Sequence, residues 1–105
     1  MLIQINTDSS VEADDRLNRL INSTVESSLS RFSDRITRVE VHLSDINAGK
    51  AGDRDKQCLM EARVAGRKPI VASDQSATLD QAVNGAADKL KRAVESLLGK
   101  MAERQ

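Results

Sequence analysis

Aromatic side chains are almost absent from this chain of 105 residues, which has one Phe and neither Trp nor Tyr. Proteins that recognise single-stranded nucleic acid by stacking its bases depend on aromatic platforms. The composition therefore argues against that mode of recognition.

Cysteine and histidine are equally scarce, with one residue of each. A single thiol excludes an internal disulfide and fits a reducing compartment. One Cys and one His cannot by themselves supply the three or four ligands of a zinc site. The phosphate-binding motifs GxxxxGK[ST] and GxGxxG are missing as well. We therefore expect no metal and no other cofactor.

Neither a leader nor a membrane span is indicated. The first ten residues lack the basic and apolar regions of a signal peptide, and no apolar run approaches the roughly 20 residues of a transmembrane helix. The net charge is zero because 16 Lys and Arg balance 16 Asp and Glu, and 39% of the residues are hydrophobic, enough for a core. We expect a single domain over residues 1–105, located in the cytoplasm.

Strand and helix patterns follow one another along the chain. Alternation of apolar and polar residues predicts strands at residues 2–6, 37–44, 57–64 and 70–73. Apolar residues at three- and four-residue steps predict two helices. The first runs to about Phe32, and the second has five or six turns from residue 79.

Local signals mark the helix starts and one loop. Ser9 with Glu12, and Thr78 with Gln81, have the spacing of capping boxes. Residues 45–55 are polar and contain glycine, which is typical of a long loop.

The resulting order, β-α-β-β-β-α, defines an α+β fold. Because a helix joins the first two strands, we expect them to be parallel through a right-handed crossover, and the later strands to pair as antiparallel hairpins. Both apolar helix faces need cover, which places the two helices on one face of a four-stranded mixed sheet, an arrangement like that of double-stranded-RNA-binding domains. The other sheet face then presents Arg38, Glu40, His42, Glu61 and Arg63 to solvent or to a partner.

Catalytic residues are not indicated, and we expect no enzyme. His42 lies on the polar side of its strand, with no nucleophile predictable beside it. Cys58 falls on the apolar side of its strand, where a small buried hydrophobe is usual. The pairs Asp14/Asp15 and Asp53/Asp55 fit a helix start and a solvated loop, and neither pair is expected to be buried as an acid/base pair requires. A small enzyme that uses His42 is the alternative, which a deep pocket beside His42 would favour.

Charged residues are unevenly distributed, so the neutral total conceals a basic end and an acidic end. Residues 63–68 contain three cations and no acid, residues 89–92 contain three more, and residues 8–15 contain four acids and no base. Lysines near a helix C-terminus also complement its dipole, which is the structural explanation of part of this pattern. As phosphate contacts, the candidates are Arg63, Arg67, Lys68, Lys89, Lys91, Arg92 and Lys100.

Three features together resemble one known family. They are Phe-Ser-Asp-Arg-Ile at 32–36 followed by Val-Glu-Val-His-Leu at 39–43, Ala-Val-Asn at 82–84 followed by Lys-Leu-Lys-Arg at 89–92, and the order of elements. They are similar to the second-strand entry and the last helix of the ribosome hibernation factors, also called the HPF/RaiA or sigma-factor modulation family. The chain resembles the short form of this family.

This resemblance implies binding rather than catalysis. Members of the family sit on the small ribosomal subunit over the decoding and tRNA positions and block translation during slow growth. By the resemblance, Lys89 and Arg92 match basic positions of the last helix and Lys100 matches a later one, whereas Lys91 is a candidate from this sequence only. We expect a translation inhibitor that contacts rRNA of the small subunit and takes no small-molecule substrate.

An interaction module of the same fold, which forms a homodimer and has lost its affinity for rRNA, is the alternative function. Zero net charge motivates it, as do Asn18 and Ser28, which stand where the family carries basic residues. A stable dimer that is insensitive to salt would favour this alternative. Ribosome association that weakens steeply with salt would favour the inhibitor.

Overall fold

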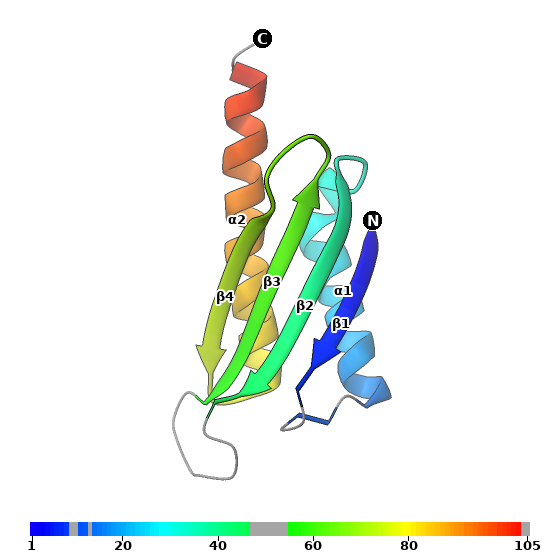
Figure 1. The fold of residues 1–105 in the computed structure, drawn as a ribbon, viewed down its shortest axis with the longest axis vertical. Helices are drawn as coiled ribbons and strands as arrows, with labels where there is room; N and C mark the ends of the chain where they lie inside the picture. Colours follow the sequence, from blue (N-terminus) through cyan, green and yellow to red (C-terminus); the bar gives the residue numbers. More distant parts are fainter. Residues whose placement is uncertain (9–10, 13, 47–54, 104–105) are drawn as a thin grey trace.

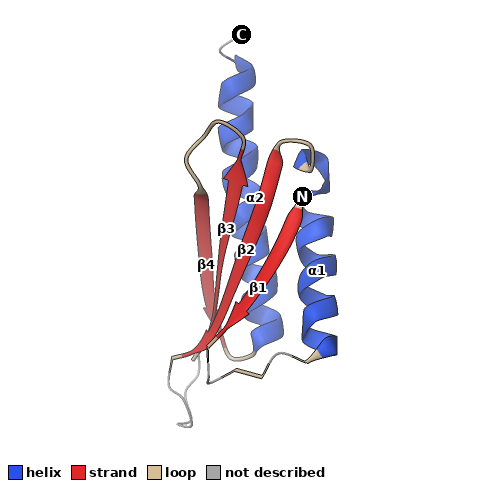
Figure 2. Ribbon diagram, turned by 45° about the vertical axis from the view of Figure 1, so that its right-hand side comes forward, coloured by secondary structure: helices blue, strands red, loops and turns tan. Residues whose placement is uncertain are grey.

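A four-stranded sheet forms one layer of the molecule and two helices form the other. The computed structural model describes residues 1–8, 11–12, 14–46 and 55–103, with side chains described as far as residue 99. Both helices lie against the same face of the sheet (Figure 1, Figure 2), which confirms the predicted α+β architecture. In chain order the elements are β1 (Leu2–Thr7), α1 (Asp15–Leu29), the 3-10 helix η1 (Ser30–Phe32), β2 (Ile36–Asp45), β3 (Lys56–Val64), β4 (Ile70–Ser76) and α2 (Leu79–Glu103).

The sheet has its strands in sequence order, β1-β2-β3-β4. As predicted, β1 is parallel to β2, and the β2–β3 and β3–β4 pairs are antiparallel. The register shifts between Ile36 and Arg38, a bulge that re-aims the side chains of β2. Because of this bulge, Ile36 and Val39 both face the core although they are three residues apart.

The core lies between the sheet and the helices. On α1, apolar residues at four-residue steps from Leu17 to Leu29 are at most 2% exposed, which confirms the predicted apolar stripe. On α2 the buried face is rich in alanine, and small side chains allow a helix to lie close to the strands beneath it. The inner face of the sheet supplies Ile36, Val39, Val41, Leu43, Cys58, Met60, Ala62 and Val64.

Each long helix begins at a capping side chain. Thr78 Oγ1 accepts a 3.1 Å hydrogen bond from the backbone N–H of Gln81, which confirms the predicted cap of α2. The predicted start of the first helix at Ser9 with Glu12 is wrong. Glu12 precedes the helix, and the N-cap is Asp14, whose carboxylate accepts a hydrogen bond from the N–H of Leu17. Ser9 itself lies outside the described residues.

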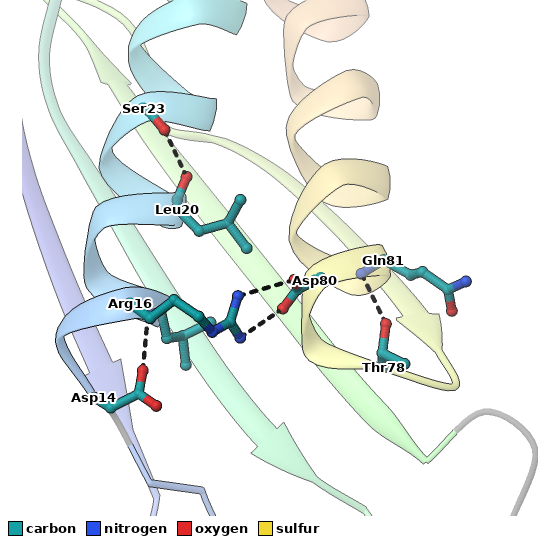
Figure 3. A network of polar contacts seen from close by, with 8 residues as sticks. Asp14, Arg16, Leu20, Ser23, Thr78, Asp80 and Gln81 are labelled. Atoms are coloured by element: carbon teal, nitrogen blue, oxygen red, sulfur yellow. Dashed lines mark hydrogen bonds and ion pairs between the residues drawn. The ribbon is translucent and has the colours of Figure 1, made fainter.

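The two helix starts are also joined to each other. The Arg16 guanidinium donates two hydrogen bonds of 3.1 Å to the Asp80 carboxylate, one to each oxygen (Figure 3). This contact raises the pKa of Arg16, because the hydrogen bonds and the negative charge of Asp80 favour the charged guanidinium. The pair therefore fixes the N-terminal turns of α1 and α2 side by side.

Other predicted boundaries need correction. β4 continues to Ser76 rather than ending at residue 73, and α2 has 25 residues, which is about seven turns. The first α-helix ends at Leu29, and η1 carries the chain on to Phe32. Despite the length of α2, no helix in the described ranges is apolar enough over a sufficient length to cross a membrane.

Candidate nucleic-acid interface

The seven predicted RNA-contacting residues come from three places in the fold. Lys89, Lys91, Arg92 and Lys100 belong to α2, Arg67 and Lys68 to the turn between β3 and β4, and Arg63 to β3. The side chain of Lys100 lies outside the described part of the chain.

Lys89 lies on the side of α2 that faces β4. Its Nζ donates hydrogen bonds to the backbone oxygen of Ser73 at 3.2 Å and to the carboxylate of Asp74 at 2.9 Å. The side chain nevertheless remains 56% exposed. Lys89 therefore fastens α2 to β4 and still presents part of its charge to solvent.

Arg92 lies between the buried residues Leu90 and Val94 in sequence but points away from the core, and it is more exposed than Lys89. Its Nη2 lies 3.0 Å from a carboxylate oxygen of Asp88, one helical turn earlier, while 76% of the arginine side chain is exposed. Ion pairs of this exposed i,i+4 type contribute little and are screened by salt. The guanidinium can therefore exchange Asp88 for an external phosphate.

Lys91 lies on the opposite side of the same helix. It follows Asp80 by three helical turns and precedes Glu95 by one, and these two acids contact Arg16 of α1 and Arg31 of η1. Lys91 thus belongs to the side of α2 that faces α1, where it is half-buried. The structure does not bring Lys91 together with Lys89.

Arg67 and Lys68 lie in a tight turn and are exposed. The turn is closed by a 3.0 Å hydrogen bond from the N–H of Arg67 to the oxygen of Val64, and it requires the positive φ of 75° at Gly66. Within the described residues, neither cation has an ion pair. These two charges are therefore available to an external anion without competition from a carboxylate of the described chain.

Arg63 lies on the outer face of the sheet, so the sheet separates it from α2. Its Nη2 is 3.2 Å from an oxygen of Glu61 and 3.9 Å from one of Glu40, and Glu40 is also 3.6 Å from Arg38. The predicted polar face is confirmed, with its charges paired within β2, within β3 and, through Arg63 and Glu40, between the two strands. Arg63 therefore belongs to a different surface from the other candidates.

Two exposed arginines that the sequence analysis did not select join Arg67 and Lys68. The backbone oxygen of Arg35 accepts a 3.2 Å hydrogen bond from the N–H of Ala65, so the connection between η1 and β2 adjoins the β3–β4 turn. Arg31, within η1 before that connection, packs its guanidinium 5.4 Å from the centre of the Phe32 ring. It lies 3.9 Å from Glu95 and remains 74% exposed. We call the set Arg31, Arg35, Arg67 and Lys68 the basic end.

Carboxylates gather at the opposite end of the molecule, where α1, β3 and α2 begin and β1, β2 and β4 finish (Figure 1). Arg16, Lys56 and, through its contact with Asp74, Lys89 are cations described there. We call the following acids the acidic end: Asp8, Glu12, Asp14, Asp15, Asp45, Asp55, Asp74 and Asp80. The described residues thus agree with the separation of charge that the sequence indicates, along a molecule 51 Å long.

One carboxylate of the acidic end is more buried than predicted. Asp55 is only 6% exposed, because its backbone oxygen accepts a 2.7 Å hydrogen bond from the N–H of Ile46 and its side chain lies 3.6 Å from Lys56 Nζ. Lys56 also donates a 2.7 Å hydrogen bond to Asp45, which raises the pKa of this lysine. These contacts close the base of the predicted 45–55 loop, whose residues 47–54 lie outside the described part.

His42 lies on the outer face beside a hollow of about 350 Å³ lined by the ends of β1, β2 and β3. The imidazole is exposed and has no hydrogen-bond partner among the described residues. A base that activates a nucleophile must be within hydrogen-bond reach of it and be held by a third group. The hollow therefore holds no assembled catalytic pair.

Comparison with known proteins yields one family and a set of similar folds. The family described as "Sigma 54 modulation protein / S30EA ribosomal protein" matches residues 3–102. The N-terminal domain of Protein Y from Thermus thermophilus has a TM-score of 0.74 at 20% identity, covering 92% of this chain and 99% of that chain. A ribosomal subunit interface protein from Coxiella burnetii has a TM-score of 0.75 at 17% identity, covering 94% and 99%. No curated protein matches the sequence.

The family match and the fold agree with the resemblance carried by residues 32–43 and 82–92, and they also confirm the prediction of a protein that is not an enzyme. The match leaves out only a few residues at either end. The chain therefore belongs to the sigma 54 modulation protein / S30EA ribosomal protein family, the hibernation-factor family of ribosome-associated, non-enzymatic regulators of translation.

Proposed function

We propose that this protein is a translation inhibitor of the hibernation type, which docks on the small ribosomal subunit in the cytoplasm through basic residues that contact rRNA. The observation that carries the proposal is the family match over residues 3–102. The Coxiella burnetii protein of similar fold is described as a ribosomal subunit interface protein, which supports a site of action between the subunits.

The proposed contact surface runs from the middle of α2 to the basic end. Arg67 and Lys68, which lack ion pairs within the described residues, make the first phosphate contacts. Lys89 and Arg92 then exchange part of their contact with Asp74 and Asp88 for phosphate oxygens. Each phosphate neutralised in this way releases condensed counterions, so affinity falls as salt rises.

Inhibition follows from occupancy rather than from chemistry. The folded chain measures 51 × 24 × 20 Å. Its helices are held to the sheet by the core and by the contact of Lys89 with β4, and the Arg16–Asp80 pair joins the two helices to each other. A rigid body loses little conformational freedom on docking. Held between the subunits, it excludes the ligands that must occupy the same space during translation.

Co-sedimentation with ribosomes through sucrose tests this proposal. We expect the wild-type protein to migrate with small subunits at low salt and to be released at moderate salt. Two double variants, Arg67→Gln/Lys68→Gln and Lys89→Gln/Arg92→Gln, should each weaken association at least about tenfold, because each removes two phosphate contacts. Thermal unfolding of Arg67→Gln/Lys68→Gln should stay close to that of the wild type, because both side chains are exposed and have no ion pair among the described residues. Lys89→Gln/Arg92→Gln should unfold at a somewhat lower temperature but still cooperatively, because it loses the contacts of Lys89 with Ser73 and Asp74.

The matched control is Arg19→Glu, which changes the charge by the same two units at one exposed position of α1. It should retain association, since this residue lies far from the basic end. Equal weakening by all three variants would show that net charge, and not this surface, controls binding. A wild-type protein that stays at the top of the gradient at low salt would overturn the proposed function.

A second copy of this chain is the alternative partner. The observation that favours it is the uncovered outer face of the sheet, whose edge strands expose Leu2 at 63% and Val71 at 53%. These two side chains lie on opposite edge strands, with the charged residues of β2 and β3 between them, so each would supply a separate apolar contact in an otherwise polar interface. A dimer in analytical ultracentrifugation that persists at high salt and is broken by Leu2→Gln/Val71→Thr would support this function. A strictly monomeric chain would exclude it.

A further inference from the structure

The β3–β4 turn and the C-terminal half of α2 enclose a hollow of about 430 Å³ at the basic end, which we call the α2 hollow. The described residues that line it are Gly66, Arg67, Lys68, Ile70, Ala93 and Leu97. Its volume lies within the range of sites that hold a small ligand or a single chemical group of a larger one. In Figure 1 the turn arches beside α2.

Two kinds of lining face each other in the α2 hollow. Ile70, Ala93 and Leu97 are half-buried and form an aliphatic floor, whereas Arg67 and Lys68 are exposed and form a cationic rim. No acid is among the described lining residues. The complementary ligand therefore has a flat apolar part next to an anionic group.

A nucleotide has both parts. The aliphatic floor can contact a base face without selecting for its hydrogen-bonding edge, and an arginine guanidinium is a known stacking surface for RNA bases. A site for one base needs no aromatic side chain. The scarcity of aromatic residues therefore argues against a run of stacked bases but does not exclude a single bound base. An acidic peptide with an apolar side chain is the competing ligand, but it has no planar group to stack on Arg67.

We propose that the α2 hollow binds one unstacked nucleotide of single-stranded RNA, with its base against Ile70, Ala93 and Leu97 and its phosphate against Arg67 and Lys68. This inference rests on the proposed function and adds to it, because it assigns to one part of the surface a contact with a base rather than with phosphates alone. The affinity of that part should then depend on the presence of a base and not only on charge.

The test uses the isotopically labelled full-length protein in solution and two probes of equal charge. One probe is a pentamer of uridylate, and the other is a pentamer of the same backbone without bases. With the uridylate pentamer, we expect amide shift changes at both the rim and the floor, including Ile70, Ala93 and Leu97. With the abasic pentamer, the changes should be confined to Arg67 and Lys68, and binding should be at least about five-fold weaker.

A variant that fills the hollow separates the base contact from the charge contact. Ala93→Leu adds bulk to the floor without changing the charge and keeps a strong helix former. It should weaken the uridylate pentamer to the affinity of the abasic one and leave the abasic affinity unchanged. Ser27→Leu, which places the same side chain at an exposed position of α1, is the matched control and should change neither.

Three outcomes would overturn the inference. These are equal binding of the two pentamers, a uridylate affinity that Ala93→Leu leaves unchanged, and floor amides that a peptide of alternating Glu and Leu shifts at lower concentration than the RNA does. None of these results affects co-sedimentation of the wild-type protein with ribosomes. Failure of this inference is therefore distinguishable from failure of the proposed function.

Discussion

The thiol of Cys58 lies on the inner face of β3 and is fully buried. Burial, and secondarily the negative charge of Asp74, raises its pKa to about 12. Because the thiolate is the reactive form, we expect Ellman's reagent at pH 8 to leave the folded protein unmodified and to react promptly once urea unfolds it. Rapid reaction in the absence of denaturant would contradict this placement of Cys58.

The same thiol links stability to alkaline pH. Its folded pKa is raised above the ordinary value of 9.0, so the folded chain holds this proton more tightly than the unfolded chain. The contribution is fully present below pH 9 and is lost as pH rises from 9 towards 12. Between pH 8 and pH 10, urea unfolding should show the wild type losing about 1.4 kcal/mol more than Cys58→Ala. Equal losses in the two proteins would show that the thiol ionises alike in both states.

Gly85 of α2 lies directly against the Asp74 carboxylate, so a methyl group added there would collide with it. Asp74 is held by hydrogen bonds of 2.9 Å from Ser76 Oγ and from Lys89 Nζ. Helix propensity favours Ala over Gly by about 1 kcal/mol, but overpacking costs about 1–3 kcal/mol. We therefore expect Gly85→Ala to destabilise the wild-type protein.

The variant Asp74→Ala separates the effect of helix propensity from that of overpacking. In Asp74→Ala the collision is gone, and Gly85→Ala should become stabilising by up to about 1 kcal/mol. Chemical unfolding of the four proteins of this cycle gives both values. The same sign in both backgrounds would mean that contact with Asp74 does not explain the glycine.

At the scale of the elements, the cap of α1 is the feature that the structure corrects most clearly. Asp14, and not the earlier Ser9–Glu12 pair, provides the capping acceptor. We expect Asp14→Ala to lower the free energy of unfolding by about 1 kcal/mol. The matched control, Glu12→Ala, removes an equal charge outside the helix and should change it by less than about 0.5 kcal/mol. Thermal or urea unfolding distinguishes these values, and a larger effect at Glu12 would restore the predicted start.

Element types were predictable because periodicity is a property of one segment and its burial. Alternation at 37–44 and four-residue steps from Leu17 to Leu29 arise because a single face of each element meets the core. Element ends are less predictable because partners elsewhere determine them. β4 extends through the polar residues 74–76 because Lys56, Gln57 and Cys58 of β3 pair with them, which their own strand propensity does not indicate.

The candidate site divides in the same way. Local runs of cations identified Arg67 and Lys68, which remain together in one turn. Arg31 and Arg35 were not predictable, because a backbone hydrogen bond between Ala65 and Arg35 joins segments 30 residues apart. The assignment of Arg63 to the same surface was avoidable from the sequence alone, because strand alternation already places Arg63 on the outer face of the sheet, away from α2.

At the scale of the whole molecule, zero net charge and a phosphate-binding surface are compatible because the charges are separated along the long axis. Exposed charges further apart than the Debye length, about 8 Å at physiological salt, are largely screened from one another. The molecule is 51 Å long, so a phosphate at the basic end experiences the nearby arginines and lysine, together with Asp34 and Glu95, and not the carboxylates of the acidic end. Local charge therefore predicts binding better than the sum over the chain does.

Salt dependence tests this separation directly. The logarithm of the ribosome association constant falls with the logarithm of salt concentration by about 0.7–0.9 for each phosphate contact. Arg67→Gln/Lys68→Gln removes two contacts and should reduce the slope by about 1.4–1.8. Glu12→Gln/Asp15→Asn changes the net charge by the same amount in the opposite direction, but at the acidic end, and should leave the slope unchanged. If the two variants instead shift the slope by equal and opposite amounts, the ribosome responds to the total charge of the protein, and an oriented contact at the basic end is excluded.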